Sequence, residues 1–329
     1  MSNTNIPLVL QGLRLPIISA PMFIVSYPDL VLAQCKAGIV GSFPALNARS
    51  PEVLDEWLSK IKEELKQFHL ANPGVKVGPI AVNQIVHASN TRLEQDMRTC
   101  VKHRVPVYIT SLRAPIKEII DAVHSYGGIV LHDVINIRHA EKALEAGVDG
   151  LILVAAGAGG HAGTLSPFAL VGEVRKMYQG PIALSGSIST GQAVLAALAM
   201  GADFAYIGTR FIASQEAHAN VEYKQAIVNA QAADIVYTDY FTGIHGNYIQ
   251  QSIINSGLDP KNLPAIQSKQ LDLNASPKPS KDKSEAKAWK DIWGAGQGVG
   301  LIEDAPNVAQ IVDRLEREFL QAKINLELQ

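Results

Sequence analysis

The residues best suited to chemistry form a glycine-rich segment, Gly157-Ala158-Gly159-Gly160-His161-Ala162-Gly163. Four glycines in seven positions let the backbone approach a flat ligand closely. They also place one titratable side chain, that of His161, among main-chain amides. We therefore predict that His161 performs acid–base chemistry in an active site. The alternative is a histidine that only hydrogen-bonds its own loop.

Residues 157–162 also match the dinucleotide-binding pattern G-x-G-x-x-A. In such a site a helix starts within the pattern, and an acidic residue follows about 20 residues later. Here the next helical pattern starts near Ser166-Pro167, and no Asp or Glu stands at that distance. The match therefore does not indicate a Rossmann fold.

Two further segments combine small residues with main-chain N–H groups. They are Ser185-Gly186-Ser187-Ile188-Ser189 and Tyr206-Ile207-Gly208-Thr209-Arg210. A helix is expected to start near Thr190, and helix N-termini and turns of this kind bind anions. We predict that the two segments hold a phosphate group. Two ordinary tight turns would use the same residue types and are the alternative.

Two single residues, Met22 and Asn83, extend the candidate site. The motifs of several other classes of enzyme are absent from the sequence. Met22 would offer a soft apolar surface and backbone groups, and Asn83 a hydrogen-bond donor and acceptor, although either could serve packing or a turn. His132, at an expected strand end, could also line the site. No pair of histidines has convincing metal-binding spacing, so we expect no metal. The sequence has no G-x-S-x-G serine, Walker A motif or strand-end lysine, which assigns the chemistry to a bound cofactor.

Eight short apolar runs are the elements that would position these side chains. They are Pro16–Met22, Ile39–Leu46, Val77–Gln84, Pro106–Leu112, Ile129–Val134, Gly150–Ala156, Pro181–Ser187 and Phe204–Phe211. Such runs are typical of strands buried on both faces, and each gap has room for one helix. Eight units favour a closed (β/α)8 TIM barrel, whose active sites lie at the carboxyl ends of the strands. A doubly wound open sheet is the alternative, because periodicity does not show closure.

The pattern divides the chain into three parts. Residues 1–211 would form the barrel, and residues 212–288 a smaller, mainly helical second domain or lid that contains an exposed loop, 256–288. The Lys-, Pro- and Ser-rich stretch at 276–283 is its most polar section. Residues 289–329 would form a turn and a closing helix that packs back on the barrel.

Composition excludes several classes of protein. The 329 residues carry 29 Lys and Arg against 31 Asp and Glu, a formal net charge of −2, so nucleic acid and membrane surfaces are not expected partners. The two cysteines, Cys35 and Cys100, suit a reducing compartment. Neither a signal peptide nor a membrane-spanning run is expected. We therefore expect a cytoplasmic protein with a small-molecule partner.

The order of these motifs resembles the nitronate monooxygenase family, formerly called 2-nitropropane dioxygenases. The resemblance rests on residues 16–22, on Val82-Asn83, on the Ala158–Gly163 segment, on Ser185-Gly186 and on Gly208-Thr209-Arg210-Phe211. The segment Trp293-Gly294-Ala295-Gly296-Gln297-Gly298 is similar as well. Flavin-dependent enoyl-ACP reductases and NAD(P)H:quinone reductases share these motifs, so the resemblance is not specific to one activity.

The resemblance implies an FMN-binding barrel that oxidises alkyl nitronates with oxygen to a carbonyl compound and nitrite. It implies a phosphate on Gly186, Ser187, Gly208 and Thr209 with Tyr206 nearby, the flavin approached by Met22, Asn83 and Gly159, and His161 beside the reactive ring. Ser187 departs from the glycine common at its position, and Val154 stands where relatives place a glutamine. A NAD(P)H-dependent quinone or enoyl-ACP reductase, and a non-catalytic ligand-binding barrel, are the rival hypotheses.

Overall fold

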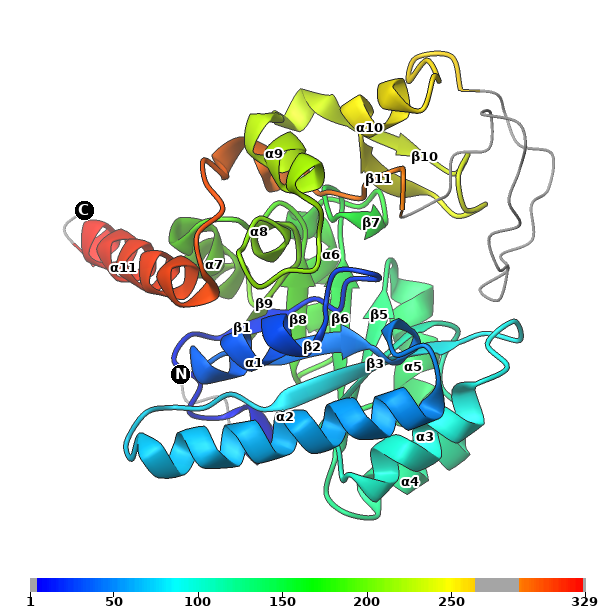
Figure 1. Ribbon diagram of the computed structural model, residues 1–329, viewed down its shortest axis with the longest axis vertical. Helices are drawn as coiled ribbons and strands as arrows, with labels where there is room; N and C mark the ends of the chain where they lie inside the picture. The colour runs from blue at the N-terminus through cyan, green and yellow to red at the C-terminus, as the bar shows by residue number, and fades with distance from the viewer. Residues whose placement is uncertain (1–4, 264–289, 328–329) are drawn as a thin grey trace.

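Eight parallel strands form a barrel in the computed structural model, which describes residues 5–263 and 290–327 (Figure 1). The strands are β1 (Ile17–Ser19), β2 (Gly41–Pro44), β3 (Ile80–Val86), β4 (Val107–Leu112), β5 (Ile129–Val134), β6 (Gly150–Val154), β8 (Ile182–Ser185) and β9 (Phe204–Ile207). They pair in the order β1-β9-β8-β6-β5-β4-β3-β2. A parallel bridge between Ile18 and Val40, next to β2, joins the two ends of that order. The closed sheet confirms the (β/α)8 barrel and rules out the open sheet.

Helices that alternate with the strands form the outer layer. They are α1 (Pro28–Lys36), α2 (Pro51–Ala71), α3 (Leu93–Lys102), α4 (Lys117–His124), α5 (Ile137–Ala146), α6 (Pro167–Met177), α7 (Gly191–Ala199) and the short α8 (Thr209–Ile212). Ser50 and Thr190 cap α2 and α7 through their side chains, and Gly147 ends α5 at a φ of +93°. No helix in the described ranges is long and apolar enough to cross a membrane.

Alternation along the strands decides which side chains face the barrel interior. The apolar cluster inside the barrel consists largely of every second residue of the strands, including Ile109, Leu131, Ile152 and Phe204. His132 follows Leu131 on β5 and therefore faces outward, where its Nδ1 lies 2.8 Å from the hydroxyl of Thr110. The suggestion that His132 lines the site is wrong, because the strand's period of two turns it toward the helices.

A second, three-stranded antiparallel sheet lies over the carboxyl ends of the barrel strands (Figure 1). Its order is β10-β11-β7, formed by Ile235–Thr238, Gly246–Ile249 and Gly160–His161. The helices α9 (Val221–Asn229) and α10 (Gln250–Asn255) accompany it. We expected a mainly helical region here, and these strands are additional. Residues 264–289, which include the predicted polar stretch 276–283, lie outside the described residues.

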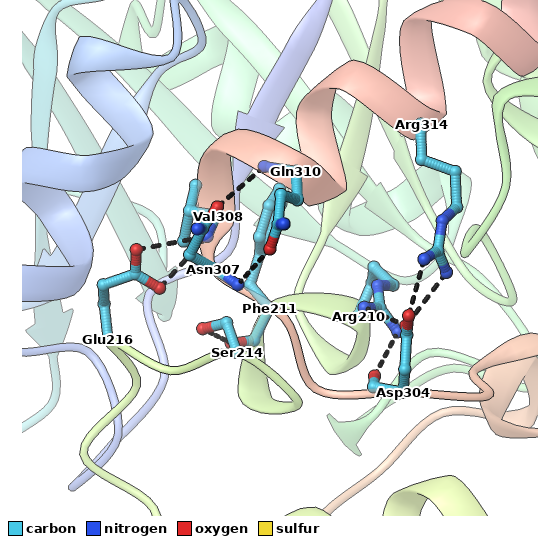
Figure 2. A network of polar contacts seen from close by, with 9 residues as sticks. All are labelled: Arg210, Phe211, Ser214, Glu216, Asp304, Asn307, Val308, Gln310 and Arg314. Carbon is cyan, nitrogen blue, oxygen red and sulfur yellow. Dashed lines mark hydrogen bonds and ion pairs between the residues drawn. The ribbon is translucent and has the colours of Figure 1, made fainter.

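The C-terminal segment returns to the barrel as a 3₁₀ turn at Gln297–Leu301 and the helix α11 (Val308–Glu327), which packs against α7. Figure 2 shows the polar network that fixes it. The buried Arg210 donates to the Asp304 carbonyl at 3.0 Å and to its carboxylate at 3.2 Å. Arg314 binds the same carboxylate, and Glu216 accepts the first N–H of α11, that of Val308, at 3.0 Å. The charged side chain of Arg210 and the first N–H group of α11 thus both have hydrogen-bond partners.

We predict that Asp304→Ala lowers the free energy of unfolding by about 2 kcal/mol, because Arg210 then keeps only a backbone acceptor for a buried charge. Asp313→Ala is the matched control on α11: its ion pair with Arg14 is exposed, and such pairs contribute about 1 kcal/mol or less. Denaturant unfolding of both variants measures the difference. Equal losses would contradict the importance of Arg210.

Candidate active site

Three loops at the carboxyl ends of β6, β8 and β9 meet the C-terminal segment at one place. The carbonyl of Gly157 accepts the N–H of Ser187 at 3.3 Å and the N–H of Gln297 at 2.9 Å. The hydroxyl of Thr209 accepts the N–H of Gly296 at 2.9 Å. The predicted residues of these loops, although far apart in sequence, therefore lie together.

Glycine is required where these backbones touch. A Cβ on Gly159 would lie 2.8 Å from the nitrogen of Gly296 and 3.1 Å from the hydroxyl oxygen of Thr209. A Cβ on Gly186, whose φ is +135°, would lie 2.7 Å from the carbonyl of Ala156. Ser187 occupies a left-handed conformation at φ +56° without being glycine, which costs about 1 kcal/mol. Its side chain is exposed beside the loops.

His161 is held by the second sheet. It lies on β7 opposite Gly246 of β11, and its Nε2 is 2.9 Å from the hydroxyl oxygen of Thr242. The Thr242 hydroxyl donates its one proton to the Ile244 carbonyl at 3.0 Å, so it accepts from His161. This network assigns the proton of the neutral imidazole to Nε2. Burial lowers the pKa of His161 to about 4, so the ring is neutral near pH 7.

A layer of polar side chains caps the apolar interior of the barrel, just below the loops. Continuing the interior positions of each strand toward its carboxyl end places there Asn83, Ser111, Asp133, Ser185 and Tyr206. Asn83 donates to the Ile109 carbonyl at 3.0 Å and to the Ser111 hydroxyl at 3.3 Å. Its Oδ1 has no partner within the described ranges and remains an acceptor. Tyr206 is buried, its ring packed in the interior cluster.

Asp133 is a residue that motif reasoning missed. Its Oδ1 is buried and has no hydrogen-bond partner in the part of the chain that the structure describes. Burial raises the pKa of its carboxyl to about 7. Its charge adds to burial in raising the pKa of Tyr206, so the two side chains act on each other. The alternation of Ile129, Leu131 and Asp133 in the sequence indicates that Asp133 shares the interior face of β5.

Both backbone groups of Met22 have hydrogen-bond partners within the chain. Its N–H donates to the Ser26 hydroxyl at 3.0 Å, and its carbonyl accepts from Asn47 at 3.1 Å. The backbone groups are therefore already used, and the side chain is what Met22 can offer a ligand. Its sulfur would lie 3.6 Å from a Cβ built on Gly208, which places the thioether against the third loop. Asn47, another residue missed, fixes this turn through its amide.

Three converging loops of small residues, a buried polar layer and a neutral histidine at the carboxyl end of a barrel define a (β/α)8-barrel enzyme with a small-molecule site. A model of the nitronate monooxygenase family matches residues 8–318, so the chain belongs to that family. A nitronate monooxygenase of Paraburkholderia phytofirmans is 26% identical over 96% of this chain and 95% of its own. A probable nitronate monooxygenase of Staphylococcus haemolyticus is 24% identical over 80% and 73%.

Solved structures share the fold. FabK from Thermotoga maritima superposes with a TM-score of 0.75 at 23% identity, over 97% of this chain and 96% of that one. A nitroalkane oxidase from Streptomyces ansochromogenes gives 0.74 at 21% identity, over 95% and 98%. At this identity the likeness establishes the barrel with its second region, not the reaction.

We predict that Gly159→Ala destabilises the protein by about 1–3 kcal/mol, because the new methyl group meets backbone atoms of the C-terminal segment. Gly172→Ala is the matched control: it lies on α6, a Cβ there meets nothing within 4 Å, and alanine favours the helix by about 0.5–1 kcal/mol. Thermal unfolding of both variants measures the contrast. Equal stability of the Gly159 variant and wild type would contradict the close packing.

Proposed function

We propose that the protein binds FMN at the carboxyl end of its barrel and oxidises alkyl nitronates with oxygen to a carbonyl compound and nitrite. The observation that carries the proposal is the meeting of the glycine-rich loop after β6 with the Ser187 and Thr209 loops, beside a neutral His161. Bound FMN would supply the electron-accepting and oxygen chemistry that no side chain provides. The protein's part is to bind, orient and donate hydrogen bonds.

The phosphate is proposed to lie on Gly186, Ser187, Gly208 and Thr209. The hydroxyl of Thr209 accepts from Gly296 and still has its own proton to donate. The amide of Ser187 is already bonded to Gly157, so its exposed hydroxyl is the group left to offer. Phosphate oxygens are strong acceptors for such donors.

The flavin ring is proposed to contact Met22, Asn83, Gly159 and Tyr206. The residues fit a polar heterocycle because Asn83 Oδ1 is an acceptor without a protein partner within the described ranges. Glycine at position 159 keeps the backbone exposed to a planar ligand. Tyr206, whose ring is inside the barrel, joins Asn83 in the polar layer.

His161 is proposed to contact the substrate. A base works best when its pKa is near the working pH, and burial holds the pKa of His161 at about 4. With its Nε2 proton donated to Thr242, the neutral ring carries no proton on Nδ1, so it can accept a proton from a neutral nitroalkane but cannot donate a hydrogen bond to a nitronate. The low pKa makes His161 a weak base, which favours the nitronate, already an anion, as the principal substrate.

We expect the FMN-loaded protein to release nitrite from an alkyl nitronate in air. His161→Asn should keep FMN but lose most turnover on the neutral nitroalkane, where proton removal is needed. A nitrite assay and the flavin spectrum measure both. Full activity of the variant on the neutral nitroalkane would contradict the role of His161 as a base. Rapid bleaching of the flavin by NADH or NADPH without oxygen would favour a reductase. A protein that stays colourless when FMN is added would favour a non-catalytic barrel.

We also expect Ser187→Ala to weaken FMN binding by about tenfold, the loss of one hydrogen bond to a charged group of about 1.5 kcal/mol. Ser189→Ala is the control, since that neighbouring serine is buried beneath the loop. Fluorescence titration with FMN compares the variants. Unchanged affinity of the Ser187 variant would remove its hydroxyl from the phosphate site.

A further inference from the structure

We propose that Asp133 contacts the anionic group of the substrate and, while protonated, donates a hydrogen bond to it. The proposal deepens and rests on the proposed function, in which the site takes a small anion. It makes Asp133 a residue that determines which ligands bind.

The position of Asp133 is set by its strand. Ile129 and Leu131 of β5 belong to the interior cluster, and Asp133 is the next residue on that face. Its register partner on β6, Ile152, is also interior. Asp133 is therefore the last interior position of β5 before the strand reaches the loops that carry the site.

The lack of a protein partner points to a ligand. Oδ1 of Asp133 is buried and unpartnered within the described ranges, and such groups are uncommon because folding loses their hydration without replacement. Asn83, in the same layer, has an unpartnered oxygen as well. Two polar groups left open in one layer indicate that something polar occupies the space above them.

The surroundings favour an anion over a cation. Burial alone raises the pKa of Asp133 to about 7, and no charged group of the described chain contributes. The titratable group that faces it is Tyr206 of β9, which burial keeps neutral. His132, next on the strand, faces α5 and its His139 instead. A neutral carboxyl donates to an anion, whereas the ionised form above about pH 7 repels one.

The probe is nitrite, which stays ionised across the range and has the size of the reacting group. Calorimetric titration of the purified protein with nitrite from pH 5.5 to 8.5 gives the affinity. For the wild type we expect it to be constant below pH 7 and to fall about tenfold per pH unit above, since one proton is then taken up on binding.

Three variants sharpen the test. Asp133→Asn keeps a donor that does not titrate, so it should bind nitrite with no such slope. Asp133→Leu has no donor and should bind about tenfold more weakly at pH 6. Asp96→Asn is the matched control, because Asp96 is also buried with one unpartnered oxygen, but it lies on α3 beside Arg92. It should keep the wild-type slope.

A wild-type affinity without a slope, or the same slope in Asp133→Asn, overturns the proposal. So does an Asp133→Asn variant with altered FMN affinity and unaltered nitrite binding, which would assign Asp133 to the cofactor. Infrared difference spectra of wild type minus Asp133→Asn give a second readout that needs no FMN: a protonated-carboxyl band that disappears above about pH 7.

The two proposals fail separately. A protein that shows the Asp133-dependent slope but releases no nitrite from nitronates keeps this inference and loses the proposed reaction. A protein that releases nitrite from nitronates but shows no pH dependence of nitrite binding keeps the proposed reaction and loses the inference about Asp133.

Discussion

The carboxyl end of the barrel depends on one backbone acceptor, the carbonyl of Gly157. It accepts N–H groups from Ser187 and Gln297 and thereby ties together segments that are 30 and 140 residues away along the chain. A side chain at position 157 would place its Cβ 2.3 Å from the Ser187 hydroxyl, at a φ of +84° that favours glycine. Seven residues after Gln297, Asp304 is bound by the buried Arg210, so this part of the C-terminal segment is fixed at two points. The contacts that hold the C-terminal segment therefore also fix the loop that carries Gly157.

The barrel divides its interior between folding and function. The lower positions of each strand are apolar and fill a packed core, whereas the last interior positions are polar and incompletely paired. Leaving the buried Oδ1 of Asp133 without a partner among the described residues costs stability, and a ligand can recover that cost on binding. The same strands thus serve two purposes, which are separated by position along each strand.

Most of the barrel could be predicted because its strands are buried on both faces and so stand out as apolar runs. Each of the eight runs overlaps one barrel strand, and seven contain the whole of it; β3 extends to Val86, two residues past its run. Gly38 and Gly201, which follow α1 and α7, have the positive φ that favours glycine. Closure required the structure, since it depends on β1 meeting β9. The strands β7, β10 and β11 were missed because they form an antiparallel sheet that joins segments far apart in the chain, and β7 and β10 are only partly buried. Asp133 lies in none of the glycine- or serine-rich segments, and its place inside the barrel follows from the face of β5 that it shares with Leu131.

His161 and Asp133 show how burial sets the charge of the site. Burial lowers the pKa of the imidazole to about 4 and raises that of the carboxyl to about 7, so both are neutral between these values. The effects on stability have opposite signs. The lowered pKa of His161 favours folding fully above its unfolded value of about 6.5 and is lost as the pH falls toward 4, whereas the raised pKa of Asp133 opposes folding increasingly as the pH rises from about 3.8 to 7. In the window where neither is charged, an anion at this mouth would meet no charge on Asp133 or His161. On the proposed function, a chain of net charge −2 would hold an anion without a basic surface, with the hydroxyls of Thr209 and Ser187 and a protonated Asp133 as donors in place of cations.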